Sequence, residues 1–229
     1  MIYFITGTDT GVGKTTVAAA LAQRCRREGS QVRYFKPVQT GLMPGEPGDA
    51  DFVAAAAGIE VEEGQRFPAA LAPVVAAEEA GKTVDYPRHL ETARRLASGC
   101  DMLLVEGAGG LLVPLTRASD TEPGLSMADL ARDLGEGTET QVVIVTRPTL
   151  GTLNHTALTL EAVRTRNLRV AGLVICGWPK EVGVVLHTNL RELSEMAPIL
   201  GIVGVCDGLD TAVPGPVELP FLAVPAAAG

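Results

Sequence analysis

Short apolar runs alternate with amphipathic segments along most of the 229-residue chain. The runs carry few charges, as expected for strands that helices cover on both faces of a sheet. They predict strands at 2–6, 31–35, 101–105, 141–146, 170–176 and 202–206. The amphipathic segments predict helices at 15–28, 50–57, 74–80, 87–98, 126–134, 152–166 and 184–196. This alternation is typical of a single α/β domain with a doubly wound, mainly parallel sheet flanked by helices.

The turn after the first predicted strand carries the first candidate chemistry. It reads Gly7-Thr8-Asp9-Thr10-Gly11-Val12-Gly13-Lys14-Thr15-Thr16 and leads into a predicted helix. Gly11 and Gly13 allow consecutive backbone N–H groups to face phosphate oxygens. Lys14 adds a mobile positive charge, and the hydroxyl of Thr15 can ligate Mg²⁺. Because the helix also points the positive end of its dipole at the turn, the pattern predicts a P-loop for a nucleoside triphosphate.

Composition and charge narrow the class of protein. Hydrophobic residues make up 46% of the chain, enough for a buried core, and charged residues only 20%, too few to suggest long disorder. The formal net charge of −8 argues against a general nucleic-acid surface, which needs a basic face. The sequence contains neither a long apolar run nor a basic leader segment. We therefore expect a cytoplasmic enzyme that binds neither nucleic acid nor membrane.

The four cysteines agree with that location. They lie at Cys25, Cys100, Cys176 and Cys206, too far apart in the sequence for a zinc-binding pair. A disulfide framework is not indicated either, so we expect reduced thiols.

Two further predicted strands end in residues suited to phosphate chemistry. Strand 31–35 is followed by Lys36, which would stand at the rim of the sheet beside the P-loop unless it is an ordinary surface lysine. At that rim, replacement of the lysine should leave folding nearly unchanged. Strand 101–105 is followed by Glu106-Gly107-Ala108-Gly109-Gly110, where an acid of the Walker B kind can hold Mg²⁺ directly or through water. A polar turn without a function is the alternative.

Asp49 and Asp51 lie at the start of the predicted helix 50–57. One of them can cap the helix, and the other can ligate a metal ion. The sequence pattern alone favours capping.

Residues 147–156 form a fourth segment at the same edge, between strand 141–146 and the next helix. The free N–H groups of that helix start suit a carboxylate or a phosphate, although simple capping explains the pattern as well. His155 has no evident partner in the sequence and is interpreted as a structural or surface histidine, and Trp178 is interpreted as a packing residue. Residues 207–229 are rich in Pro, Ala and Gly, which predicts an irregular C-terminal segment of the same domain.

Taken together, these segments resemble the dethiobiotin synthetase family. The matching residues are Thr6-Gly7-Thr8-Asp9-Thr10, Val12-Gly13-Lys14-Thr15, Lys36-Pro37-Val38, Gly41, Val105-Glu106-Gly107-Ala108-Gly109-Gly110, Leu150-Gly151 and Asn154-His155. The P-loop is one residue longer than the common form because its first glycine is Gly7. That longer loop is itself a trait of the family.

The resemblance implies an ATP- and Mg²⁺-dependent ring closure in biotin biosynthesis. 7,8-Diaminononanoate and CO₂ would give dethiobiotin, ADP and phosphate. One amine would capture CO₂ as a carbamate, the carbamate oxygen would attack the γ-phosphate, and the second amine would displace phosphate from the mixed anhydride. In that scheme Lys14 and Lys36 offset the accumulating negative charge.

The resemblance also assigns binding residues. Thr15, Asp49 and Glu106 would hold the metal, which favours Asp49 over Asp51 as the ligand. The nucleotide would contact Gly11, Val12, Gly13, Lys14, Thr15, Thr16, Asp49, Glu106, Gly107, Ala108, Gly109, Cys176 and Gly177. The diamine would contact Thr10, Lys36, Thr40, Gly151, Thr152, Leu153 and Asn154. A homodimer is implied, in which the helix start at Gly151–Asn154 holds the substrate carboxylate across the interface.

Two positions depart from the pattern of the family. Gly11 stands where members often carry Glu. Cys176 stands where many members read adenine with an Asn, and a thiol cannot offer the paired contacts of an amide to a base edge. The preferred nucleobase is therefore open.

Two other classes of P-loop protein fit the residues less well. A cobyrinate-type amide synthetase would bring a glutaminase domain, for which 229 residues leave no room. A partitioning or septum-positioning ATPase would carry a second lysine early in the P-loop, and residues 6–12 contain none. The residues favour the synthetase over both.

Overall fold

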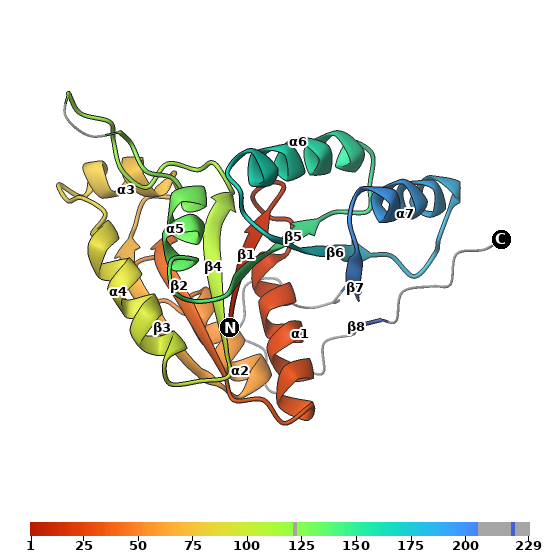
Figure 1. The fold of residues 1–229 in the computed structure, drawn as a ribbon, viewed down its shortest axis with the longest axis horizontal. Coiled ribbons are helices and arrows are strands. Elements are labelled where there is room, and N and C mark those ends of the chain that lie inside the picture. Colours follow the sequence, from red (N-terminus) through yellow and green to blue (C-terminus); the bar gives the residue numbers. More distant parts are fainter. Residues whose placement is uncertain (121–122, 206–220, 223–229) are drawn as a thin grey trace.

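The computed structural model describes residues 1–120, 123–205 and 221–222, and its fold is drawn in Figure 1. The strands are β1 (Ile2–Gly7), β2 (Val32–Thr40), β3 (Glu60–Phe67), β4 (Met102–Gly110), β5 (Thr140–Thr146), β6 (Val170–Trp178), β7 (Ile199–Gly204) and β8 (Phe221–Leu222). The helices are α1 (Lys14–Arg27), α2 (Asp49–Ala57), α3 (Pro73–Glu79), α4 (Tyr86–Ala97), α5 (Met127–Leu134), α6 (Thr152–Thr165) and α7 (Val184–Met196).

In the described residues the strands form one sheet in the order β3-β2-β4-β1-β5-β6-β7-β8. Strands β1 to β7 run parallel, and β8 pairs antiparallel with β7. The apolar side chains of α1 and α2 pack on one face, and those of α3 to α7 pack on the other. This layering confirms the predicted doubly wound, mainly parallel sheet.

The edge strand β3 was not predicted. Its sequence, Glu60-Val61-Glu62-Glu63-Gly64-Gln65-Arg66-Phe67, is mostly charged or polar and shows no apolar face. Charged side chains are common on edge strands because they discourage pairing with other chains. The strand is held by its backbone pairing with β2, which a search for hydrophobic patterns does not detect.

Two strands run further than the apolar runs that predicted them. β2 continues to Thr40 because it goes on pairing with β3 beyond Phe35. β4 continues to Gly110, which pairs with Gly7 of β1. Lys36 and Glu106, which were expected just after their strands, therefore lie inside β2 and β4.

The C-terminal part differs from expectation in two places. β7 begins at Ile199 and ends at Gly204, earlier than the predicted strand 202–206. The short strand β8 lies within 207–229, where an irregular segment was expected. The rest of that segment, with Cys206 before it, lies outside the described residues.

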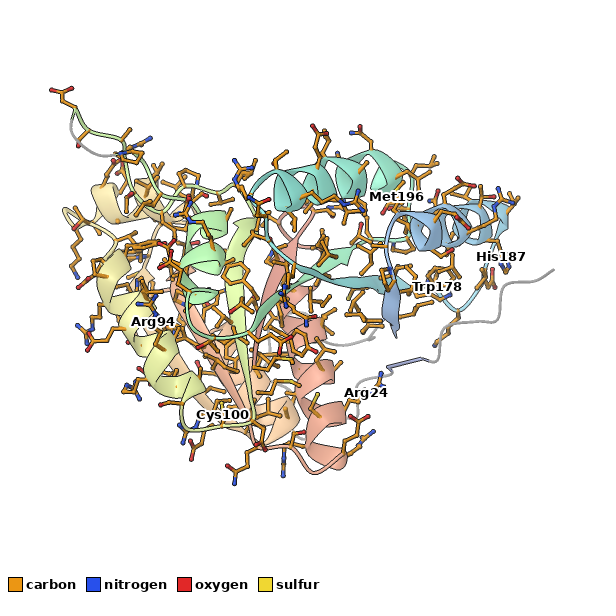
Figure 2. The ribbon with its side chains drawn as sticks, in the orientation of Figure 1. Arg24, Arg94, Cys100, Trp178, His187 and Met196 are labelled. Atoms are coloured by element: carbon orange, nitrogen blue, oxygen red, sulfur yellow. The ribbon has the colours of Figure 1, made fainter. Side chains whose placement is uncertain are left out.

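Trp178 lies at the end of β6 near α7 (Figure 2). It belongs to the core on the face of the sheet that α3 to α7 cover, and it is 7% exposed. This confirms its predicted packing role. In the part of the chain that is described, no helix combines the length and the apolar character needed to cross a bilayer.

The arrangement of the central strands positions the site. β1 lies between β4 and β5 in the sheet. β4 belongs to the first half of the sequence and β5 to the second half. In open α/β sheets, ligands bind in the crevice at the carboxyl ends of such strands. The P-loop, which follows β1, lies at this crevice.

Candidate active site

The P-loop is packed directly against the end of β6. Gly13, which precedes α1, has a φ of 92°, in the left-handed region that glycine adopts without strain. A Cβ atom at this position would lie 2.3 Å from Sγ of Cys176. Both the backbone conformation and the space therefore require glycine here.

Lys14 begins α1 and lies inside the loop rather than in solvent. Its side chain is 7% exposed, and Nζ lies 3.3 Å from the backbone oxygen of Asp9. Burial lowers the pKa of Lys14 below its ordinary value, although the nearby carboxylate of Glu106 acts in the opposite direction. An anionic ligand in the loop would relieve this cost by supplying an opposite charge.

Lys36 joins two carboxylates at the point where β2 and β4 diverge. The strands pair up to Phe35 and Val105, so the next residues, Lys36 and Glu106, lie side by side. Nζ of Lys36 is 2.7 Å from Oε1 of Glu106 and 2.6 Å from Oδ2 of Asp49 at the start of α2. Lys36 is 3% exposed and Glu106 1% exposed. We refer to these three residues as the Lys36–Asp49–Glu106 cluster.

The charges in the cluster stabilise one another. Burial by itself lowers the pKa of Lys36, but Glu106 and Asp49 outweigh it, so the pKa of Lys36 is raised overall. Burial raises the pKa of Asp49, and the ammonium of Lys36 outweighs that effect, so the pKa of Asp49 is lowered overall. The lysine is therefore protonated and Asp49 ionised at neutral pH. Lys36 lies at the expected end of the β2–β4 pairing, but it is buried there and not exposed at the rim.

The oxygen atoms of the cluster fit a magnesium ion. Oγ1 of Thr15 donates to Oε1 of Glu106 at 2.9 Å, and Oδ2 of Asp49 lies 2.6 Å from the same ammonium of Lys36 that pairs with Glu106. Two carboxylates thus meet at one ammonium group, and a hydroxyl contacts one of them. Mg²⁺ prefers such oxygen ligands and commonly takes others from substrate phosphates. No group of three or more His, Cys, Asp and Glu side chains that could hold a metal occurs among the described residues.

The two aspartates of the α2 start have different partners. Oδ2 of Asp51 accepts the N–H of Gly48 at 2.7 Å, which is a capping contact. Asp49 instead forms the ion pair with Lys36, and its N–H donates to Oε1 of Gln39 at 3.2 Å. Of the alternatives that the sequence left open, the structure places Asp51 at the cap and Asp49 in the cluster.

Tyr34 and Gln39 are the polar residues near the cluster that sequence reasoning missed. The hydroxyl of Tyr34 donates to Oε2 of Glu106 at 2.9 Å. Tyr34 precedes Lys36 by two residues, and alternate residues of a strand share a face. The two-residue spacing from Lys36 could therefore have indicated Tyr34. The contact between Gln39 and Asp49 could not be predicted in this way, because it depends on how the chain folds back from β2 to α2.

The loop before α6 is linked to the P-loop. Arg147 forms an ion pair with Asp9 at 3.1 Å. The hydroxyl of Thr8 donates to Oγ1 of Thr146 at 3.4 Å, and Thr146 also shares hydrogen bonds with Thr152 and Thr156 of α6. The start of α6 is therefore fixed relative to the P-loop, which the sequence did not reveal.

The four residues predicted at the α6 start differ in exposure. Gly151 has a φ of 91° and precedes the helix, and Thr152 is 1% exposed. Leu153 packs against the core, whereas Asn154 is exposed. The N–H of Thr152 donates to the oxygen of Thr149 at 3.2 Å, so the unpaired helix-start donors among the described residues are those of Leu153 and Asn154.

The remaining predicted residues line the same edge of the sheet. Thr10 lies beside Gly109, since a Cβ atom at Gly109 would lie 3.4 Å from Oγ1 of Thr10. The P-loop thus faces the turn of Glu106–Gly110. Thr40 ends β2 half-buried, and Cys176 is buried at 9% exposure. Val12, Thr16, Gly107, Ala108 and Gly177 lie in the loop, at the start of α1 and in the last residues of β4 and β6.

Comparison with known proteins identifies the family. A family model described as an AAA domain matches residues 2–212. An ATP-dependent dethiobiotin synthetase BioD from Mycobacterium avium is 43% identical over 88% of this chain and 86% of that protein. The protein of the same name from Anaeromyxobacter dehalogenans is 48% identical over 84% of each chain.

Solved structures share the fold at much lower identity. The septum site-determining protein MinD of Pyrococcus horikoshii, complexed with Mg-ADP, is 18% identical over 89% of this chain and 80% of its own, with a TM-score of 0.52. McdA from Cyanthece is 13% identical over 90% and 86%, with a TM-score of 0.54. These structures support the fold alone, whereas the curated relatives are similar over nearly their full length. The chain belongs to the dethiobiotin synthetase family.

Proposed function

We propose that this protein catalyses the ATP-dependent ring closure of 7,8-diaminononanoate with CO₂ to dethiobiotin, ADP and phosphate. The observation that carries the proposal is the Lys36–Asp49–Glu106 cluster beside the P-loop, in which Lys36 and Glu106 are buried and Asp49 is half-buried. It combines a positive charge for phosphoryl transfer with oxygen ligands for a cation. The names of the curated relatives support the same activity.

In this proposal the two buried lysines act on developing negative charge. Lys14 contacts the phosphates in the P-loop, and Lys36 stabilises the carbamate oxygen and the γ-phosphate as the bond between them forms. Thr15, Asp49 and Glu106 would hold Mg²⁺, which neutralises phosphate charge when it is bound. Because the site is enclosed, these charges interact more strongly than they would in water.

The carboxylate at the far end of the diaminononanoate chain needs a separate anchor. We propose that the unpaired N–H groups of Leu153 and Asn154 at the α6 start provide it, since a helix start attracts anions without a basic side chain. The chain would act as a homodimer in which the helix start of one subunit completes the site of the other. We also propose that the protein is located in the cytoplasm.

The proposal is tested by following ADP release with ATP, Mg²⁺ and bicarbonate, with and without diaminononanoate. Release that depends on the diamine and matches dethiobiotin formation is expected. Release that is independent of the diamine would favour a different P-loop activity.

Replacing either proposed metal-binding carboxylate should raise the Mg²⁺ concentration needed for half-maximal rate. Glu106→Gln and Asp49→Asn each replace a carboxylate oxygen with an amide, a poorer ligand for a hard cation. Asp51→Asn is the matched control, because Asp51 caps the same helix without joining the cluster. A shift in Asp51→Asn without one in Asp49→Asn would reverse the assignment.

Nucleobase selectivity should be loose. A site that hydrogen-bonds one base edge can discriminate by about 10⁴, whereas the buried thiol of Cys176 offers no such pair of contacts. We expect kcat/KM for ATP, GTP and CTP to lie within roughly tenfold to a hundredfold of one another. A preference for ATP of several thousandfold would mean that other groups read the adenine.

A further inference from the structure

Tyr34 holds the carboxylate oxygen of Glu106 that faces away from Lys36. Its side chain is completely buried, and its hydroxyl donates to Oε2 of Glu106 at 2.9 Å. The other oxygen, Oε1, accepts from Thr15 at 2.9 Å and from Lys36 at 2.7 Å. The two oxygens of one carboxylate are thus assigned to different partners.

The phenol is suited to a permanent donor role. A phenol O–H is a neutral donor, and Oε2 of Glu106 accepts it inside the core. A hydrogen bond to Oε2 also removes the freedom of the carboxylate to rotate about its last bond.

We propose that Tyr34 is a positioning residue for Glu106, holding the carboxylate so that Oε1 faces Thr15 and a bound Mg²⁺. Residues that hydrogen-bond to metal ligands commonly set the orientation and the affinity of the site. The inference rests on the proposed role of Glu106 as a magnesium ligand. Tyr34 would act through Glu106, whose Oε2 accepts its hydroxyl.

The chain offers a matched control for this hydrogen bond. The hydroxyl of Tyr86 donates to Oδ2 of Asp133 at 2.7 Å, and Tyr86 is 6% exposed. That pair joins α4 to α5, outside the cluster. Tyr34→Phe and Tyr86→Phe each remove one phenol–carboxylate hydrogen bond and leave the ring in place.

The test measures metal binding without turnover. Mn²⁺, which shares the preference of Mg²⁺ for oxygen ligands, can be titrated into protein with ADP and followed by electron paramagnetic resonance. We expect Tyr34→Phe to weaken Mn²⁺ binding by roughly tenfold or more. Tyr86→Phe should bind like the unchanged protein. Equal affinities in the two variants would overturn the inference.

A double substitution separates this inference from the proposed function. In the Glu106→Gln background, Tyr34→Phe should add no further loss of Mn²⁺ affinity, because the group it positions is gone. Full additivity of the two losses would make Tyr34 merely structural. If Glu106→Gln alone leaves Mn²⁺ affinity unchanged, the proposed role of Glu106 fails and the inference falls with it.

A second measurement covers the case in which Tyr34→Phe does not fold. The chain has only three tyrosines, Tyr3, Tyr34 and Tyr86, so 3-fluorotyrosine labelling gives three ¹⁹F signals. Signals are assigned with Tyr3→Phe and Tyr86→Phe. Addition of Mg²⁺ and ADP should shift the Tyr34 signal and leave that of Tyr86 in place. An unmoved Tyr34 signal under saturating Mg²⁺ and ADP would overturn the inference.

Discussion

Replacing Lys36 with Ala should lower kcat by about a hundredfold or more. Removal of one preorganised electrostatic contact to a transition state costs about 3 to 4 kcal/mol of activation free energy. The ammonium of Lys36 is fixed between two carboxylates and excluded from water, so no solvent molecule can replace it equally well. Steady-state rates at saturating ATP, Mg²⁺ and diaminononanoate measure the effect.

The same substitution should also destabilise the fold, contrary to the expectation for a lysine at the rim. Without Lys36, the buried carboxylate of Glu106 and that of Asp49 lose the ammonium that pairs with both, and only the more distant charge of Lys14 remains. Breaking a buried ion pair in this way costs about 3 to 5 kcal/mol of unfolding free energy. Urea denaturation measures the loss, and Lys82→Ala, which changes an exposed lysine, is the control. Near-full activity of Lys36→Ala at saturating substrate would refute the catalytic assignment.

Mixing the variants Lys14→Ala and Asn154→Asp should restore activity that neither has alone. Asp at position 154 repels the substrate carboxylate and raises KM for diaminononanoate, while Lys14→Ala disables the P-loop. If sites are shared, each heterodimer contains one site built from two intact halves. Random exchange of subunits should then give roughly a quarter of the original activity.

Asn154 is the better position for this experiment than Leu153. Asn154 is exposed, so its replacement leaves the core intact, whereas Leu153 packs against the core and Leu153→Asp would also disturb packing. Nucleotide binding by Asn154→Asp should be unchanged. A monomeric mass in solution, or no recovery after confirmed subunit exchange, would rule out the shared site.

The central strands could be predicted because their burial is reflected in short runs of apolar residues. Strands such as β1 and β5 are covered on both faces, are mostly apolar and carry no charged residue, so a short window suffices. β3 could not be predicted, because its pairing depends on backbone hydrogen bonds to β2 and its side chains are those of a polar edge. The ends of β2 and β4 were misplaced for the same reason, since pairing partners rather than apolar side chains extend them.

The charged residues of the candidate site could be predicted from the sequence, but the burial of Lys36 and Glu106 could not. Lys36 and Glu106 were found because each follows an apolar run, yet the register that places them side by side is a property of the sheet. The contact of Asp49 depends on the path from β2 to α2, which the sequence does not specify locally. Arg147 and Asp9 are distant in sequence, and nothing in either segment indicates that they pair.

The most direct test of the proposed activity is the mass of the product formed from diaminononanoate, ¹³C-labelled bicarbonate, Mg²⁺ and ATP. We predict dethiobiotin that carries the label, with one ADP released for each molecule formed. Because the label enters through the carbamate, labelled dethiobiotin must have been formed in the reaction. Any contaminating dethiobiotin is recognised because it lacks the label. ADP release with no labelled dethiobiotin, under conditions in which the protein is folded, would contradict the account.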